Sequence, residues 1–433
     1  MKTYILGLGL CLCMTSCLND GFLDIDPKDR QTEQTAFTSY DNFKMYSWGL
    51  YEIFYGYGNN QDMNFFKGEY EADNMIRAVK GNEGQYAYQK AKVNATDSDW
   101  DYDYIRKVNL MLDNVDDSEM SDTEKEHWRS VGYFFRAYKY FQMMSLFGDI
   151  PWIEHVLTES SEELYASRDP RDLVAKNILS NLKYAEEHIK ESGDGDNTIN
   201  TSVVQALISR FGLFEGTWRK YHGLEDAETY LRASAEASEK IMAKFKDLHP
   251  RYDEIFNSED LSGVPGIILY KAYETAQLGH GLTRMVRTGE SKIEMTKDAV
   301  DSYLCKNGYP IENGASLYGG DHDVYKQFTN RDADIDPVLW EIRRERRVEL
   351  MGEGFRFDDL RRWKKGHYVD KQPLGVYVSN PAEYGNKLLI NAEGYVYFFE
   401  KPLGWLDKYY LRPIPLNQKA LNPNLGQNPG WEE

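Results

Sequence analysis

The chain has 433 residues, of which 41% are hydrophobic and 28% are charged, a composition typical of a folded protein with a large core. It carries 51 Lys and Arg against 70 Asp and Glu, which gives a formal net charge of −19. This balance argues against nucleic acid or an anionic membrane surface as the main partner, because both require a basic footprint. The four cysteines are too few for a disulfide-held scaffold.

The first 17 residues have the features of a secretory signal. Lys2 gives a positive start, residues 4–14 form an apolar run too short to span a bilayer, and Thr15 and Ser16 precede Cys17. Small residues followed by cysteine resemble a bacterial lipoprotein cleavage site, and the alternative is an ordinary signal peptide with an incidental cysteine. We therefore predict a signal peptide over 1–16, lipidation at Cys17, a tether over 17–38, and membrane attachment by the lipid anchor only.

From residue 39 to about 246 the hydrophobic pattern is helical. Helices are expected over 39–54, 100–115, 123–147, 171–190, 201–221 and 226–244. Ser121, followed three residues later by Glu124, predicts a capping box at the start of the third helix, and Asn200 follows a Gly- and Asp-containing loop before the fifth. Paired helices joined by polar loops predict a helical-repeat scaffold of the tetratricopeptide kind.

Beyond about residue 252 the pattern changes. Short strands are expected over 266–273 and 395–401, and a helix is expected from Pro337 to a stop at Gly352 and Gly354. The clustering of prolines near the end predicts an extended C-terminus. The fold class expected is therefore mainly α: a helical-repeat region over 39–246, followed by an irregular region over 252–433 with short strands and loops.

One helix face in the second region combines apolar and charged residues. Leu339, Ile342, Arg346 and Leu350 fall nearly on one face of the helix that begins at Pro337. An arginine within an apolar face needs a counter-charge, and the nearby candidates are Glu349 and Glu353.

Motifs for catalysis or metal binding are absent from the sequence. There is no H-E-x-x-H, no G-x-S-x-G and no phosphate-binding loop. Aspartate runs over 97–103 and 332–336 imitate the start of a calcium loop but lack its glycine and its final glutamate, so we interpret them as acidic residues at helix N-termini. A pair of carboxylates could run glycoside hydrolysis, but nothing singles one out. The sequence predicts no enzyme, no metal and no cofactor.

Several stretches, in a fixed order, carry a resemblance to a known family. They are the cleavage site followed by FLD (22–24), RAYKYF (136–141) running into LFGDIP (146–151), NRD (330–332), IRRERRVEL (342–350) running into EGFRFDDLRRW (353–363), and YLRPIP (410–415) with LNPNLGQNPGW (421–431). Together they resemble the SusD/RagB family of outer-membrane nutrient-binding lipoproteins. Within that family these motifs are mainly structural, so they indicate the fold and not the ligand.

The resemblance implies four tetratricopeptide-like units with an irregular C-terminal part packed against them. It further implies a lipid-anchored protein on the outer-membrane surface of Bacteroidetes, which binds an oligosaccharide and delivers it to a SusC-like TonB-dependent transporter. The alternatives are a peptide ligand, or a mainly structural lid of that transporter with little ligand affinity of its own.

The resemblance also places ligand contacts in two loops, here 73–98 and 273–292. Sugar rings stack on aromatic side chains while nearby polar groups bind the hydroxyls. Tyr86 and Tyr88, two residues apart, would face the same way in an extended loop. For each tyrosine, packing in an aromatic-rich interior is the alternative. The candidate ligand-binding residues are Asn74, Arg77, Tyr86, Tyr88, Tyr273 and Arg287.

Overall fold

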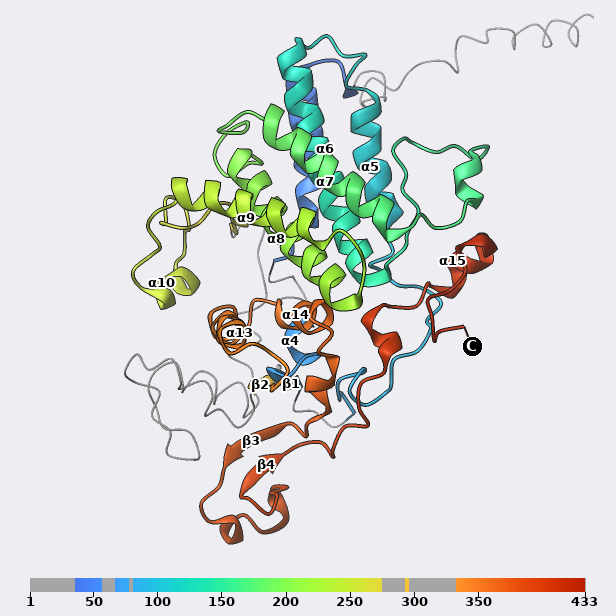
Figure 1. Cartoon of the computed structure of the whole chain (residues 1–433). Coiled ribbons are helices and arrows are strands. Elements are labelled where there is room, and N and C mark those ends of the chain that lie inside the picture. The colour runs from blue at the N-terminus through green and yellow to red at the C-terminus, as the bar shows by residue number, and fades with distance from the viewer. Residues whose placement is uncertain (1–35, 57–66, 78–80, 275–292, 296–331, 433) are drawn as a thin grey trace, which may run out of the picture.

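The structure is a computed structural model that describes residues 36–56, 67–77, 81–274, 293–295 and 332–432 (Figure 1). The expectations for the signal peptide, for Cys17, for Arg287 and for nearly all of the loop over 273–292 lie outside the described residues.

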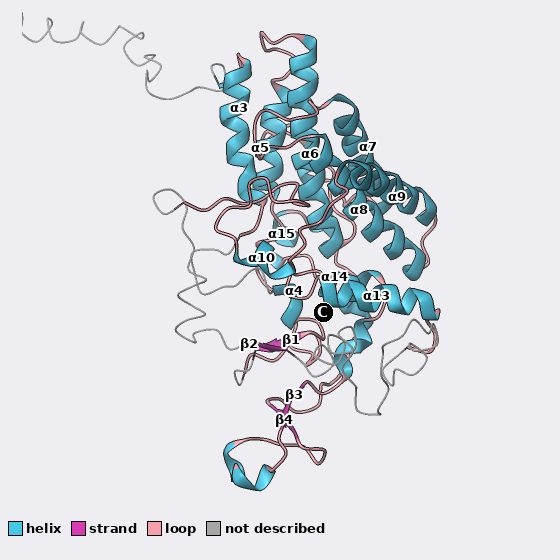
Figure 2. Ribbon diagram, turned by 90° about the vertical axis from the view of Figure 1, so that its left-hand side faces the viewer, coloured by secondary structure: helices cyan, strands magenta, loops and turns pink. Residues whose placement is uncertain are grey.

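The upper part of the molecule is a stack of long helices (Figures 1 and 2). These helices are α3 (Tyr40–Trp48), α5 (Tyr102–Asp113), α6 (Asp122–Phe147), α7 (Arg171–His188), α8 (Thr201–His222) and α9 (Ala227–Lys244), with a 3₁₀ turn over Gly49–Ile53 after α3. All six expected helices are present with boundaries within a few residues, and α6 packs along α7 as α8 packs along α9. The mainly helical, tetratricopeptide-like fold is confirmed.

Local hydrogen bonds fix the starts of these helices. The Glu124 carboxylate accepts from the backbone nitrogen of Ser121 at 2.9 Å and from its hydroxyl at 2.7 Å. The Asn200 side-chain oxygen accepts from the backbone nitrogens of Ser202 at 2.9 Å and Val203 at 3.2 Å. Because the first N–H groups of a helix lack partners within the helix, such residues set where it begins.

The close approach of α8 to α9 depends on two glycines. A Cβ on Gly212 would lie 2.5 Å from the Tyr230 carbonyl oxygen, and one on Gly216 would lie 2.7 Å from Leu231. Neither position has room for a side chain, so the two backbones touch directly. Beneath this contact the aromatic core includes Phe141 and Phe211, whose ring centroids are 5.3 Å apart.

The lower part of the molecule combines residues 67–77 and 81–93 with the chain from 332 onward (Figure 2). Among the described residues, the elements outside the six long helices are α4 (Lys67–Tyr70), β1 (Met75–Arg77), α10 (Tyr252–Asn257), β2 (Ile293–Met295), α13 (Pro337–Glu349), α14 (Arg356–Arg362), β3 (Leu374–Tyr377), β4 (Tyr395–Tyr397) and α15 (Leu416–Leu421). Short 3₁₀ turns cover Glu162–Tyr165, Gly366–Asp370, Pro381–Glu383, Gly385–Lys387, Asp407–Tyr410 and Pro423–Leu425. Antiparallel pairs form between β1 and β2 and between β3 and β4.

The strand expected over 266–273 is wrong, and the one expected over 395–401 is shortened to β4. Around Tyr270 the main chain is bound by a side chain. Asn197 donates to the Tyr270 carbonyl oxygen at 2.8 Å and accepts from its nitrogen at 3.0 Å. An amide side chain thus replaces a neighbouring strand, which the local sequence cannot show.

The buried face of α13 is not the one expected from its apolar residues. Ile342 is 58% exposed, whereas Arg343, Arg344 and Arg347 are each less than 10% exposed. Arg346 forms an ion pair at 2.9 Å with Asp359 of α14, and its charge also acts on Glu353, one of the two expected glutamates. Burial of this cationic face is possible because carboxylates neutralise most of it: Asp73 pairs with Arg347, and Glu341 and Glu345 of α13 itself pair with Arg344.

The aspartates of the runs over 97–103 and 332–336 form ion pairs and helix caps within the protein. Arg412 lies 3.3 Å from a carboxylate oxygen of Asp97 and 2.5 Å from one of Asp99. Asp101 caps α5 and Asp336 caps α13 by accepting backbone N–H bonds. In the described ranges no three His, Cys, Asp or Glu side chains are placed to hold a metal ion.

The C-terminal segment is tied to the end of α6. The Arg412 nitrogen donates to the Leu146 carbonyl oxygen at 2.7 Å, and the Asn428 side chain donates to that of Phe147 at 2.8 Å. The segment is largely extended, as expected, with α15 as a short helical interruption. Among the described helices, none has both the length and the apolar character needed to cross a membrane.

His127 of α6 makes the stability of the fold dependent on pH. The ring is fully buried and its Nδ1 accepts from the Lys190 nitrogen at 3.2 Å. Burial, with the nearby Lys190 charge, lowers the pKa of His127 from 6.5 to about 4. The unfolded chain therefore binds a proton between these values that the folded chain does not bind, so stability is full above pH 6.5 and falls as the pH approaches 4.

We expect the free energy of unfolding to fall by about 2 kcal/mol from this residue alone between pH 7 and pH 5. Urea titrations at the two pH values measure it. The variant His127→Asn keeps an acceptor near the Nδ1 position but does not titrate, so its difference between the two pH values should be smaller by that amount. An unchanged difference would contradict this account.

Candidate functional site

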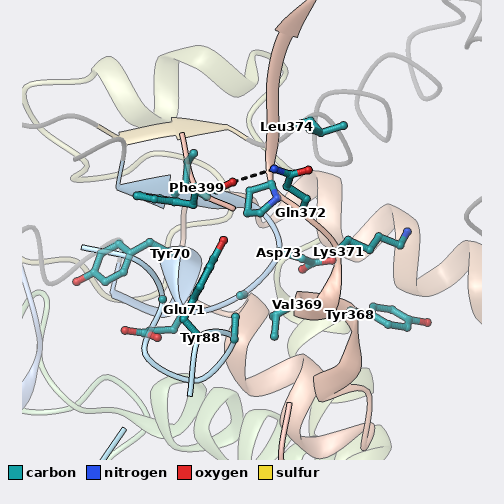
Figure 3. A pocket seen from close by; sticks show the side chains of 15 residues that line it. Tyr70, Glu71, Asp73, Tyr88, Tyr368, Val369, Lys371, Gln372, Leu374 and Phe399 are labelled. Carbon is teal, nitrogen blue, oxygen red and sulfur yellow. Dashed lines mark hydrogen bonds between the residues drawn. The ribbon is translucent and has the colours of Figure 1, made fainter. Parts of the chain in front are cut away.

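An open pocket of about 660 Å³ lies in the lower part of the molecule (Figure 3). Its walls come from the segment that follows α4 and from the segment that leads into β3, with the end of β4 closing one side. The lining residues are Tyr70, Glu71, Ala72, Asp73, Ile76, Gly84, Ala87, Tyr88, Tyr368, Val369, Lys371, Gln372, Pro373, Leu374 and Phe399.

Tyr88 supplies an aromatic wall of this pocket. Its hydroxyl donates to the Glu400 carbonyl oxygen at 2.7 Å, and its ring meets the edge of Phe399 with centroids 6.1 Å apart. Burial raises the pKa of Tyr88, so the hydroxyl stays protonated. Because both its hydroxyl and its ring are held, Tyr88 presents a fixed, half-buried ring among the residues drawn in Figure 3.

Polar groups are distributed around the same cavity. The Gln372 side chain donates to the Phe399 carbonyl oxygen at 2.9 Å, and the Glu71 carboxylate accepts from Gln85 at 3.2 and 3.4 Å. Lys371 lines the opposite wall and is exposed. An apolar pocket with a few placed polar groups is the usual form of a small-ligand site.

Asp73 anchors the wall between α4 and α14. Its carboxylate oxygens accept from Arg356 at 2.6 and 2.8 Å, and one lies 3.3 Å from Arg347. Burial would raise its pKa, but the two guanidinium groups outweigh burial and hold the pKa of Asp73 well below its usual range. Asp73 is therefore ionised at neutral pH and already neutralised by the protein.

Asn74, a predicted ligand residue, is buried and forms hydrogen bonds within the protein. It is 1% exposed, donates to Glu69 at 2.6 Å and accepts from Arg347 at 2.6 Å. Glu69 in turn accepts from the Gly354 nitrogen at 3.1 Å. Both ends of the amide are therefore occupied by a buried network that joins α4 to α13, and Asn74 offers no group to the pocket.

Tyr86 and Tyr88 were expected to face the same way, but their side chains point in different directions. Tyr86 is 5% exposed, stacks on Phe357 at 5.1 Å and meets the edge of Tyr409 at 5.4 Å. The segment is a turn and not extended, with the Tyr88 nitrogen bonded to the Gly84 carbonyl oxygen at 3.1 Å. Since side chains two apart share a face only in extended backbone, the two rings separate, and Tyr86 packs in the core.

The remaining predicted residues do not join the pocket. Tyr273 is half-buried, does not line this pocket, and lies against Gly56. The side chain of Arg77, like Arg287, lies outside the described residues.

The pocket also contains residues that sequence reasoning missed. Tyr70 lies three residues before the first predicted loop, so its position is a usable signal. Tyr368, Gln372 and Phe399 come from the far end of the chain, and no spacing in the sequence indicates that they meet Tyr88.

Comparison with known proteins assigns the chain to a family. The family profile described as "Starch-binding associating with outer membrane" matches residues 21–213, and the SusD family profile matches residues 333–431. The SusD-like protein P2 of Formosa agariphila is 27% identical over 116 residues, which is 27% of this chain and 23% of that protein. The match thus spans less than a quarter of that relative's length.

Two solved structures show the same fold. A SusD-like carbohydrate-binding protein from Bacteroides fragilis superposes with a TM-score of 0.71 at 18% identity, covering 90% of this chain and 100% of that one. A laminarin-binding SusD-like protein gives a TM-score of 0.56 at 16% identity, covering 91% and 100%. With residues 21–213 and 333–431 matched by family profiles and the fold shared over 90% of the chain, the protein belongs to the SusD/RagB family.

Proposed function

We propose that the protein is a surface-exposed, lipid-anchored glycan-binding protein of the outer membrane. It captures an oligosaccharide in the pocket around Tyr88 and delivers it to a SusC-like TonB-dependent transporter. The observation that carries this proposal is the pocket itself: a fixed Tyr88 ring beside Phe399, with Gln372, Glu71 and Lys371 at the rim. A pyranose offers an apolar C–H face to such a ring and hydroxyls to such polar groups.

The names of the relatives support the same ligand class. One solved relative is described as carbohydrate-binding and another as laminarin-binding, and one matching profile is described as starch-binding. We propose binding without catalysis, because the acidic side chains at the pocket are engaged: Asp73 by two arginines and Glu71 by Gln85.

Tyr88 is the residue to test. Replacing it by alanine removes the ring, so affinity for a bound oligosaccharide should fall roughly tenfold or more, as expected for an aromatic contact residue. Isothermal titration of the purified protein with laminarin and starch oligosaccharides measures this. Tyr88→Phe is the matched control: it keeps the ring and loses only the bond to Glu400, so it should retain most of the affinity.

Tyr86→Ala provides the opposite control, because it removes a core ring. It should lower stability by about 3 kcal/mol without a selective loss of affinity in the folded fraction. A Tyr88→Ala protein that binds as tightly as the parent would refute this site. Absence of binding by the parent to every saccharide, with binding of peptides, would instead favour a peptide ligand, and absence of both would favour a structural lid.

The anchor is tested at Cys17. Cys17→Ala should move the protein from the detergent phase to the aqueous phase in a phase-partition experiment, because the acyl chains are lost. Cys305→Ala is the matched control and should remain in the detergent phase. Equal partition of the two variants would contradict lipidation.

The transporter partner is tested by purification from native outer membranes in mild detergent. A tagged form of the chain should recover a SusC-like transporter in near-equal amount, since delivery requires a standing complex. A different outer-membrane lipoprotein with the same tag controls for non-specific recovery. Repeated purification of the chain alone would count against the complex.

A further inference from the structure

A second cavity, open to solvent and of about 820 Å³ with its open mouth included, adjoins the first. The two share Asp73, Tyr368 and Lys371, so these side chains form a common wall. The second cavity is lined by Asp73, Asp332, Ile335, Trp340, Arg343, Arg344, Arg347, Arg356, Trp363, His367, Tyr368 and Lys371. Most of these residues belong to α13, α14 and the turn over Gly366–Asp370.

The charge of this cavity is opposite to that of the protein. Its lining includes four arginines and one lysine against the two carboxylates of Asp73 and Asp332, whereas the whole chain has a net charge of −19. A concave basic site on an acidic protein concentrates positive potential where solvent screening is weakest.

Partners within the protein occupy most of these charges. Arg347 and Arg356 are neutralised by Asp73, at 3.3 and 2.6 Å. Arg344 forms ion pairs with two glutamates of its own helix, at 2.6 and 2.5 Å. Asp332 lies 2.5 Å from Lys365 and accepts from the Tyr368 hydroxyl at 3.1 Å. These groups are structural.

Arg343 differs from these groups because two of its side-chain nitrogens have no hydrogen-bond partner. It is 7% exposed, and its Nε and Nη1 atoms are buried without a hydrogen-bond partner. Its guanidinium carbon lies over two rings, 4.3 Å from the centroid of Trp363 and 5.0 Å from that of Tyr221. The nearby carboxylate of Asp359 is already shared between Arg346 and Arg362, both at 2.9 Å.

Two buried N–H donors without an acceptor are costly, because Nε and Nη1 of Arg343 have lost water without gaining a hydrogen bond. The planar fork of an arginine fits the two oxygens of a carboxylate or a sulfate in a bidentate arrangement. The Trp363 ring already holds the guanidinium by a cation–π contact, which limits the freedom lost when an anion binds.

We propose that this second cavity binds an anionic substituent of a saccharide, a carboxylate or a sulfate ester, with Arg343 as the donor. The proposal rests on the proposed function, because the anionic group is carried by the captured glycan. It narrows the ligand class from oligosaccharides in general to acidic ones, with neutral sugar units at Tyr88 and the charged group at Arg343.

Calorimetry of the full chain tests this with three matched probes: a neutral oligosaccharide, an oligogalacturonate and a sulfated oligosaccharide. We expect one of the two acidic probes to bind at least tenfold more tightly than the neutral one, and this preference to fade with added salt. The stronger of the two identifies the group as carboxylate or sulfate. Inorganic sulfate at high concentration should compete with the acidic probe and leave binding of the neutral probe unchanged.

Arg343→Gln should abolish the preference for the acidic probe without weakening binding of the neutral one. Its melting temperature should be unchanged or higher, because an unpaired buried charge is removed; a purely structural arginine would give a lower value. Arg343→Lys keeps the charge but loses the fork, and should retain part of the preference. Arg232→Gln, which makes the same charge change at an exposed ion pair on α9, is the control.

The outcomes separate the two proposals. Binding of the neutral probe through Tyr88, with no preference for either acidic probe, overturns the anion site alone. Absence of binding by all three probes overturns the proposed function and the anion site together. An acidic preference that survives in Arg343→Gln places the anion elsewhere and overturns the assignment to Arg343.

Discussion

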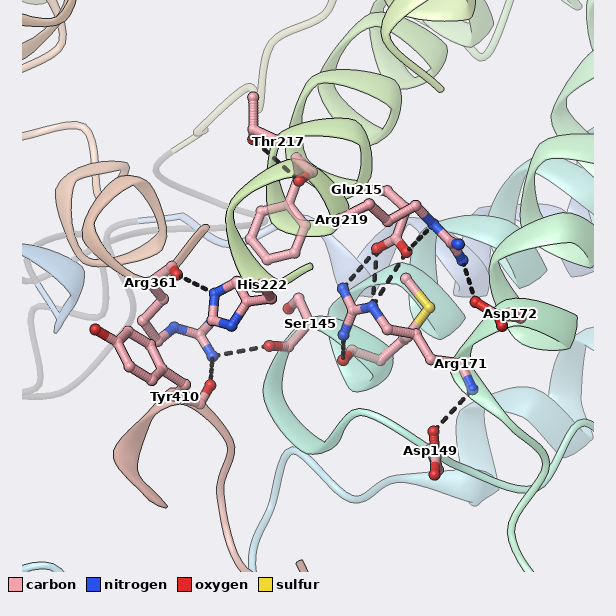
Figure 4. Close-up of polar contacts among 12 residues, drawn as sticks. Ser145, Asp149, Arg171, Asp172, Glu215, Thr217, Arg219, His222, Arg361 and Tyr410 are labelled. Atoms are coloured by element: carbon pink, nitrogen blue, oxygen red, sulfur yellow. Dashed lines mark hydrogen bonds and ion pairs between the residues drawn. The ribbon is translucent and has the colours of Figure 1, made fainter. Parts of the chain in front are cut away.

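The arrangement of the scaffold depends on one buried carboxylate, that of Glu215 (Figure 4). It is fully buried in α8 and accepts from Arg171 Nε at 3.1 and 3.0 Å and from Arg219 Nε at 2.8 Å. Arg171 begins α7 and also donates to the Met144 carbonyl oxygen of α6 at 3.2 Å. A buried charge that loses its partner is destabilising by several kcal/mol, so these hydrogen bonds favour the observed arrangement of α6, α7 and α8.

Buried arginines of the short helix α14 likewise connect the pocket to the helical stack. Arg361, which is 1% exposed, donates to the carbonyl oxygens of Ser145 at 2.8 Å and Tyr410 at 3.2 Å, and its own carbonyl oxygen accepts from the His222 ring at 2.9 Å (Figure 4). Arg356, at the other end of α14, holds Asp73 in the pocket wall. One seven-residue helix therefore determines where the pocket lies relative to the helical stack.

This division explains why the family motifs over 353–363, 410–415 and 421–431 indicate a fold and not a ligand. The stretch over 353–363 supplies Arg356, Arg361 and Arg362, and the stretch over 410–431 supplies Arg412 and Asn428, all of which bind other parts of the chain. The groups that face the pocket, such as Tyr88, Gln372 and Phe399, lie outside these stretches. A shared fold at 18% identity is compatible with pocket walls of different composition.

The sequence by itself determined the features that depend on neighbours along the chain. The long helices, the capping box at Ser121 and the cap at Asn200 follow from residues within a few positions of one another, so they could be predicted.

The tertiary structure decided which side chains are free for a ligand. Tyr86 and Tyr88 are alike in sequence, but Phe357, Tyr409 and Trp405 come from the other end of the chain to enclose the first and leave the second at the cavity. Likewise, the arginine-rich face of α13 is buried because Asp73 and Asp359 lie opposite it. Contacts between residues so distant in the chain leave no periodic pattern in the sequence of either segment.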